Sequence, residues 1–177
     1  MSTSGIDLRA YVRDIPDFPQ PGIAFKDITP LLLDPRAIDA AVRRLARFAE
    51  RLDIEFVVAA EARGFILGGA LARQLGAGFV PARKPGKLPH ETVSAEYTLE
   101  YGINALEVHA DALAGGHRVL IHDDLLATGG TASALCDLVT RLGAEVVACA
   151  FLVELSYLGG RARLAPNRVF SLIPYEA

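Results

Sequence analysis

The sequence has little of what several large classes of protein require. It holds only two cysteines, Cys136 and Cys149, which have no metal-site spacing and nothing to indicate an oxidising environment, so we interpret both as small buried hydrophobic residues. The four histidines also lack the spacing of zinc ligands. No apolar stretch approaches membrane-spanning length, and a net charge of −3 gives no case for binding nucleic acid or membranes through bulk charge.

What is present fits one globular domain. Hydrophobic residues make up 51% of the chain and charged residues 22%, and 177 residues are enough for a sizeable core. The first residues, Met1–Asp7, are polar and show no signal-peptide pattern. We therefore expect a single cytoplasmic domain with no membrane or nucleic-acid partner.

The most informative segment runs from Val119 to Thr131. An apolar strand is predicted to end in two carboxylates, Asp123 and Asp124, followed by the loop Thr128–Thr131 and a helix from Ala132. The backbone N–H groups of such a loop and first helical turn lack helical partners and converge on one spot, which the helix dipole makes positive. Glycines let a ligand approach closely, so the loop indicates a phosphate site. The acids would suit the hydroxyls of a sugar attached to that phosphate, directly or with a metal ion nearby.

Two widespread phosphate-binding motifs do not match this segment. A Walker loop needs Lys and then Ser or Thr after its last glycine, whereas Gly130 is followed by Thr131 and Ala132. No G-x-G-x-x-G dinucleotide fingerprint occurs at this position. The acidic pair before Thr-Gly-Gly-Thr instead resembles the ribose-phosphate signature of type I phosphoribosyltransferases, which use 5-phosphoribosyl 1-pyrophosphate. The simpler alternative is an ordinary strand–turn–helix with polar loop residues.

Strands and helices alternate through the middle of the chain, which predicts an α/β fold with a parallel sheet flanked by helices. Ligands of such sheets bind beyond the carboxyl ends of the strands, so Glu61–Gly64, Arg83–Lys84 and Asp123–Thr131 should meet at one edge. The predicted helices are 6–15, 35–52, 64–75, 131–142 and 157–164, and the predicted strands are 56–60, 79–82, two within 93–108, 119–121, 146–153 and 169–173.

Basic side chains follow two of these strands. Arg63 lies at a strand end and suits a second anionic group such as a pyrophosphate, although taken alone it would be an ordinary surface arginine. Arg83, Lys84 and Lys87 cluster around a loop, 84–92, whose composition indicates mobility. That loop could close over a substrate or could be only a solvated charged loop.

Two further segments offer groups for a flat base. The proline-rich stretch Phe18–Pro30 presents free backbone polar groups beside Phe25, which suits a stacked heterocycle but equally a core-packing loop. Glu96 and Glu100 flank Tyr97 and could exchange a proton with a substrate nitrogen or could be surface residues. Spacing alone does not separate these alternatives.

The whole chain resembles the adenine phosphoribosyltransferases, a branch of the type I phosphoribosyltransferase family. The acidic-pair loop is shared across the family, whereas the Arg-Lys-Pro-Gly-Lys-Leu-Pro loop and the later Glu-Tyr-Gly separate this branch from its relatives. The chain departs from the branch at Lys26, where members often carry Arg, and at His122, where an aliphatic residue commonly stands. The matching landmarks are Pro16–Gly22, Phe25–Ile28, Arg63–Phe65, Arg83–Pro89, Leu99–Gly102, Asp123–Thr131, Leu152–Leu155 and Ser171–Tyr175.

The resemblance implies an enzyme that transfers the phosphoribosyl group of 5-phosphoribosyl 1-pyrophosphate to adenine, giving AMP and pyrophosphate, with Mg²⁺ on the donor. It implies a type I phosphoribosyltransferase fold with a small hood that binds the base (1–34), a core (35–177) and a flexible flap (about 84–101), assembled as a homodimer. Glu100 would be the acid/base at the purine, and Arg83 could reach across the dimer interface. The donor would be bound by Arg63, Arg83, Lys84, Lys87, Asp123, Asp124, Ala127, Thr128, Gly129, Gly130 and Thr131, with both aspartates on the ribose, and adenine by Ala24, Phe25, Lys26 and Leu155.

Two other functions stay open at this point. A phosphoribosyltransferase for a 6-oxo purine such as hypoxanthine would need a positioned donor, which Lys26 could supply; its adenine-type surroundings lead us to expect a 6-amino purine. A regulatory protein that senses the donor would usually show a decayed loop or an added nucleic-acid-binding region, and the sequence shows neither.

Overall fold

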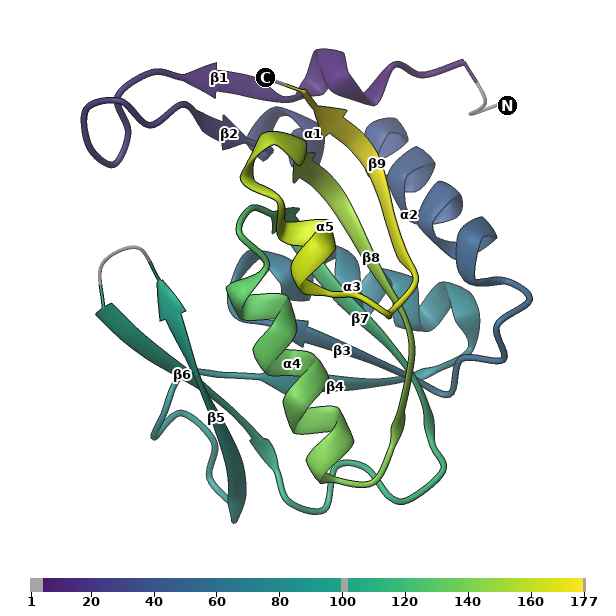
Figure 1. The fold of residues 1–177 in the computed structure, drawn as a ribbon. Coiled ribbons are helices and arrows are strands. Elements are labelled where there is room, and N and C mark those ends of the chain that lie inside the picture. The colour runs from purple at the N-terminus through teal and green to yellow at the C-terminus, as the bar shows by residue number, and fades with distance from the viewer. Residues whose placement is uncertain (1–4, 100–101, 177) are drawn as a thin grey trace.

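The computed structural model describes residues 5–99 and 102–176, and within them a sheet of five parallel strands forms the centre of the molecule (Figure 1). The strand order is β4-β3-β7-β8-β9. This arrangement confirms the predicted α/β fold with a parallel central sheet flanked by helices. The strands are β3 (Phe56–Ala60), β4 (Gly78–Ala82), β7 (Arg118–Leu126), β8 (Glu145–Leu155) and β9 (Val169–Tyr175).

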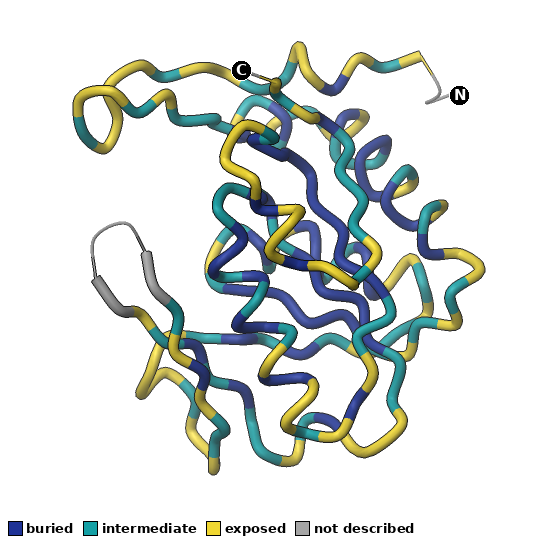
Figure 2. The backbone as a smooth tube through the Cα atoms, viewed as in Figure 1, coloured by how far each residue is buried: buried dark blue, intermediate teal, exposed yellow. Residues whose placement is uncertain are grey.

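Successive residues of the central strands pack against different helical layers. Ile121 belongs to a core cluster with Leu135 of α4 (Gly130–Arg141), whereas its neighbour Leu120 packs in a cluster with Leu45 of α2 (Pro35–Ala49) and Leu71 of α3 (Arg63–Leu75). Both faces of the sheet are therefore buried, as the dark blue central strands of Figure 2 show, which explains their near-continuous apolar sequence. The helices are α1 (Thr29–Leu33), α2 (Pro35–Ala49), α3 (Arg63–Leu75), α4 (Gly130–Arg141) and α5 (Gly160–Arg163), with 3₁₀ turns η1 (Leu8–Tyr11) and η2 (Ser156–Leu158).

Two antiparallel strand pairs lie outside the central sheet. The pair β1 (Arg13–Ile15) and β2 (Phe25–Asp27) crosses the molecule near the carboxyl ends of β8 and β9, and the hairpin of β5 (Thr92–Leu99) and β6 (Gly102–His109) packs beside α4 (Figure 1). The ring of Tyr175 connects the first pair to the last strand. Its centroid is 4.5 Å from Arg9 Cζ and 3.9 Å from Lys26 Nζ, and both contacts are cation–π interactions.

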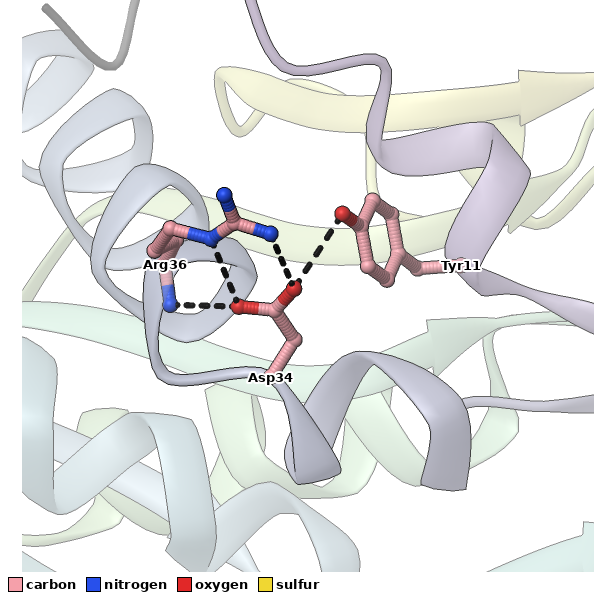
Figure 3. Close-up of polar contacts among 3 residues, drawn as sticks. All are labelled: Tyr11, Asp34 and Arg36. Atoms are coloured by element: carbon pink, nitrogen blue, oxygen red, sulfur yellow. Dashed lines mark hydrogen bonds and ion pairs between the residues drawn. The ribbon is translucent and has the colours of Figure 1, made fainter.

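Asp34 fixes the start of α2 and joins it to the N-terminal segment (Figure 3). Its Oδ1 accepts a hydrogen bond from Arg36 N at 2.8 Å, which caps the helix, while Oδ2 accepts from Tyr11 Oη at 3.2 Å. The Arg36 guanidinium is 3.1 Å from Oδ2. These donors, the Arg36 side chain first, lower the pKa of Asp34 to about 2.

The N-terminal segment corrects one sequence prediction. Residues 6–15 do not form the predicted helix: only Leu8–Tyr11 turn as a 3₁₀ helix, and Arg13–Ile15 form a strand. Asp7 caps this single turn, and pairing with β2 then draws the chain into an extended conformation. The sequence pattern also missed β2 and α1, which are too short to show a hydrophobic period.

Two predicted boundaries are also corrected. The strand predicted at 119–121 continues to Leu126 because β8 pairs with it as far as Glu154, so the acidic pair lies within the strand and not after its end. The helix predicted at 157–164 is divided into η2 and α5 by Gly159, whose φ is 70°. Among the described residues, no helix has the length and apolar character needed to cross a membrane.

Candidate functional site

The acidic pair lies near the carboxyl end of β7, beside the start of α3. Asp124 is only 4% exposed, and its Oδ2 is 3.0 Å from Arg63 Nε, an ion pair whose alignment is not that of a hydrogen bond. Within the part of the chain that the structure describes, that Oδ2 accepts no hydrogen bond. Asp123 accepts one from the backbone N–H of Asp124 at 2.9 Å. The site thus presents carboxylate oxygens with unused capacity to accept hydrogen bonds.

The surroundings oppose ionisation of both carboxyls. Burial raises the pKa of Asp123 well above its usual range, and the neighbouring charge of Asp124 raises it further. Burial also raises the pKa of Asp124, although the Arg63 guanidinium acts in the opposite direction. Two acids that are costly to ionise and keep unused capacity to accept hydrogen bonds are suited to a ligand that brings hydroxyl groups or positive charge.

The loop after β7 forms the second part of the site. Gly129 has a φ of 79° and is the N-cap residue of α4, and no side chain caps that helix. The N–H groups of the first turn of α4 therefore lack helical acceptors, and they lie at the positive end of the helix dipole. Arg63 and every residue from Asp123 to Ala132 line a cavity of about 190 Å³. The predicted phosphate loop, the acids and Arg63 thus meet in one cavity.

Gly64 lets α3 approach this acidic pair. A Cβ at position 64 would lie 2.7 Å from Asp123 Oδ1, closer than atoms can pack. Because glycine has no Cβ, the first turn of α3 can lie directly against β7, which also brings Arg63 to Asp124.

A second, larger cavity of about 560 Å³ adjoins the first, and the two share Leu125, Ala127 and Thr128. The ring of Phe25 is held in a T-shaped contact with Phe18, with centroids 5.1 Å apart. Arg63 Cζ lies 5.0 Å from the centre of the same ring. The lining residues are Pro19, Gln20, Gly22, Ile23, Ala24, Phe25, Lys26, Leu125, Ala127, Thr128, Leu155, Tyr157 and Leu158.

Lys26 lines this cavity, but its ammonium group is engaged elsewhere. Nζ is 2.6 Å from Asp14 Oδ1, across the β1–β2 pair, and lies over the Tyr175 ring. Because successive side chains of a strand point to opposite faces, the side chains of Lys26 and Phe25 lie on opposite faces of β2. The Lys26 side chain is therefore not placed to donate to a ligand stacked on Phe25.

The basic loop is organised by Glu61, which the sequence placed at the same edge of the sheet, and by Glu107, which it did not. Arg83 Nε is 2.8 Å from Glu61 Oε2, and Glu61 Oε1 accepts the backbone N–H of Lys84 at 3.2 Å. Glu107 Oε2 accepts the N–H of Gly86 at 3.1 Å. Burial raises the pKa of Glu61, but the hydrogen bonds from Arg83 and the Lys84 N–H and the charges of Arg83 and Lys87 together outweigh it, and the net shift is downward. The loop is thus fixed by carboxylates on β3's end and on β6.

The predicted site residues therefore fall into three groups. The first cavity contains Arg63, Asp123, Asp124 and the phosphate loop, and the second contains Ala24, Phe25, Lys26 and Leu155. Arg83, Lys84 and Lys87 line neither cavity among the described residues. Glu100 lies outside the described residues.

Sequence reasoning missed Tyr157 and Leu158, which form part of the wall of the larger cavity. Both follow β8 at the carboxyl edge of the sheet. The rule that ligands bind beyond the carboxyl ends of parallel strands would have identified both residues if it had been applied to β8.

The chain is similar to known proteins along most of its length. A model of the phosphoribosyl transferase domain matches residues 32–172. The adenine phosphoribosyltransferase of Thermotoga neapolitana is 59% identical over 170 residues, which cover 96% of this chain and 100% of the relative. The adenine phosphoribosyltransferase structure from Thermoanaerobacter pseudethanolicus superposes with a TM-score of 0.93 at 51% identity, covering 95% of this chain and 98% of that one. The Saccharomyces cerevisiae enzyme, complexed with D-2,5-dideoxy-2,5-imino-altritol 1,6-bisphosphate and adenine, gives a TM-score of 0.88 at 38% identity, covering 94% and 96% of the two chains.

Proposed function

The chain belongs to the phosphoribosyl transferase family, and on that premise we propose how its residues divide the work of the reaction. Its activity is the transfer of the phosphoribosyl group from 5-phosphoribosyl 1-pyrophosphate to adenine, giving AMP and pyrophosphate. The observation that supports the division best is the shared wall of the two cavities. Because Leu125, Ala127 and Thr128 border both, a sugar phosphate in one would present its C1 to a base in the other.

We propose that the phosphate loop and the acidic pair hold the ribose 5-phosphate. The N–H groups of Ala127–Thr131 would bind the 5′-phosphate at the start of α4. Asp123 and Asp124 would accept hydrogen bonds from the ribose hydroxyls, using the free capacity of the buried Oδ2. Departure of pyrophosphate builds positive charge on the ribose ring, and these carboxylates lie where they can stabilise it.

Adenine would occupy the larger cavity. Phe25 and Leu155 would contact its two faces, while the backbone of Ala24 and Lys26 would bind its polar edge. The engagement of Lys26 Nζ with Asp14 argues against a 6-oxo purine, which needs a side-chain donor at this position. The geometry therefore favours adenine over hypoxanthine.

Arg63 and the basic loop would bind the leaving pyrophosphate. Arg63 lines the donor cavity. Lys84 and Lys87 lie in the predicted flap of about 84–101, of which the structure describes 84–99, and Arg83 directly precedes it. In this proposal the flap closes over the donor and keeps water from competing with adenine. Glu100 is proposed as the acid/base at the purine.

The acidic pair fits a Mg²⁺ ion that arrives with the donor. The described residues include no group of three histidine, cysteine or acidic side chains that could hold a metal by themselves. We propose no direct protein ligand: the pyrophosphate and ribose of the donor would hold the ion, and Asp123 and Asp124 would place carboxylate oxygens, which Mg²⁺ favours, beside that ribose. When bound, the ion would supply positive charge to the pyrophosphate.

We further propose a single domain with a base-binding hood (1–34) and a core (35–177), a homodimer as the working assembly, and a cytoplasmic location. The paired contacts of Arg9 and Lys26 with Tyr175 support a hood that is attached to the core yet separate from its sheet. The charged donor cannot cross a membrane unaided, which supports placing the enzyme where the donor is made.

The test is incubation with adenine, the donor and Mg²⁺, followed by mass detection of AMP and pyrophosphate. The unaltered protein should form both in equal amounts. The double variant Asp123→Asn, Asp124→Asn should keep its circular dichroism spectrum and form no AMP. If that variant retains full activity, the proposed ribose site is wrong.

A further inference from the structure

The segment that follows β8 touches both halves of the site. Tyr157 and Leu158 of η2 line the base cavity. The chain then turns at Gly159 and begins α5 at Gly160, which packs against the loop that follows β7. Only Gly159 therefore lies between Leu158, in the wall of one cavity, and Gly160, which supports the loop of the other.

The contact between Gly160 and the phosphate loop is made backbone to backbone. A Cβ at position 160 would lie 2.2 Å from Ala127 O and 2.9 Å from Gly129 N. In the opposite direction, a Cβ on Gly129 would lie 2.8 Å from Gly160 O. Because neither residue has a side chain to give way, a shift of α5 moves the phosphate loop directly.

Arg161 holds this segment in place. Its Nε and Nη2 contact Glu154 Oε1 and Oε2 at 3.0 and 2.5 Å, which is a bidentate ion pair. Nη1 donates to Val169 O at 2.7 Å, so the same guanidinium also binds β9. The Glu154 side chain is only 4% exposed and is adjacent to Leu155 of the base cavity. Burial raises the pKa of Glu154, but hydrogen bonds from Arg161 and Ser171 and the charge of Arg161 together leave it below its usual value.

We propose that Arg161 and Glu154 are positioning residues for the transfer reaction. Their ion pair fixes η2 and α5 as one unit on the end of β8, and that unit sets the distance between the base wall and the phosphate loop. Each substrate contacts mainly one cavity, so each can bind when the unit is displaced. The reaction, and the product AMP that spans both cavities, require the two at a fixed separation. The inference rests on the proposed function and assigns it two further residues.

The test compares Arg161→Lys with Arg118→Lys. Lysine cannot reproduce the bidentate fork. Arg118 is a matched control because it also binds a carboxylate (Glu145, 2.9 Å) and a backbone carbonyl (Leu52), but at the opposite end of β7. In Arg161→Lys, we expect kcat to fall about tenfold or more and the Kd of AMP to rise, while KM for adenine and for the donor stays within about threefold. Arg118→Lys should lower Tm comparably and leave kcat unchanged.

Two results would overturn the positioning role: unchanged kcat and AMP affinity in Arg161→Lys, or an equal loss of kcat in Arg118→Lys. A second pair of variants tests the proposal in case Arg161→Lys folds poorly. Gly160→Ala should lower kcat, whereas Gly69→Ala, where a Cβ would meet nothing within 4 Å, should not; equal activity of those two variants also contradicts the proposal. If the unaltered protein forms no AMP, the proposed function itself fails, which is a separate outcome.

Discussion

Lys26 and Asp14 face each other across the β1–β2 pair, with Nζ 2.6 Å from Oδ1. The same ammonium lies over the Tyr175 ring. Lysine is the residue through which this cavity could have selected a 6-oxo purine, and the ion pair directs it away from the base. The base preference should therefore not depend on its charge.

Replacing Lys26 with Ala tests this relationship. We expect the ratio of kcat/KM for adenine to that for hypoxanthine to stay within about threefold of its original value, a difference below 1 kcal/mol. The measurement is a competition assay with both bases. Phe25→Ala is the comparison, because loss of the stacking ring should lower kcat/KM for adenine. A Lys26→Ala variant that gains hypoxanthine activity or loses its preference would contradict the proposed base site.

Asp123→Asn should make the protein more stable and less active. Burial and the nearby Asp124 raise the pKa of Asp123, so the folded protein retains a proton that the unfolded chain releases, and stability falls as pH rises above the unfolded pKa. Asparagine removes that penalty and can still accept the Asp124 N–H. Thermal unfolding at pH 7 should show a higher Tm, with AMP formation reduced about a hundredfold.

The control is Asp111→Asn, because that side chain is 73% exposed, lies between β6 and β7 and does not line the cavity of the acidic pair. Its Tm and activity should match those of the unaltered protein. A lower Tm in Asp123→Asn would show that the acidic pair is not a source of electrostatic cost.

His122 should make stability depend on pH between about 4 and 6.5. Its ring is fully buried, Nδ1 bonds Ala150 O at 2.9 Å, and burial lowers its pKa to about 4. The unfolded chain takes up a proton below about pH 6.5 that the folded protein refuses until about pH 4, so stability is highest above this window and falls as pH decreases through it.

His122→Leu should remove this slope, which amounts to at most about 3 kcal/mol across the window. Urea unfolding of both proteins at pH 7 and pH 4.5 measures the difference. The difference in free energy of unfolding between the two proteins at pH 7 reports repacking alone. The test is therefore how much that difference changes between pH 7 and pH 4.5. Equal pH dependence in the two proteins would show that His122 is protonated or hydrated in the folded state.

At lower pH, Asp27 and Asp34 should control stability. Both have a pKa lowered to about 2, Asp27 first by its hydrogen bond with Thr29 and Asp34 first by that with Arg36. Each stabilises the fold above its unfolded pKa and loses that effect as pH falls toward 2. Asp34→Asn, which keeps the helix cap but not the charge, should therefore have a shallower acid-unfolding curve. An unchanged curve would exclude Asp34 as a source of acid sensitivity.

Sequence reasoning worked where local chemistry determined structure. The strand, acidic pair, glycine loop and helix around Asp123 follow one another directly, and the rule for carboxyl ends of parallel strands placed Arg63 beside them. It failed where contacts between residues distant in the sequence determine the structure. The length of β7 is set by pairing with β8, and the loop at Gly86 is held by Glu107, neither of which leaves a periodic signal. Glu154 and Arg161 meet only because the chain reverses at Gly159, a turn that the predicted continuous helix concealed.

The most direct measurement is a crystal structure of the protein with AMP. We predict the 5′-phosphate at the N–H groups of Ala127–Thr131, the ribose hydroxyls on Asp123 and Asp124, and the base between Phe25 and Leu155. A nucleotide bound with its phosphate away from the start of α4, or with its base outside the cavity of Phe25, would contradict this assignment.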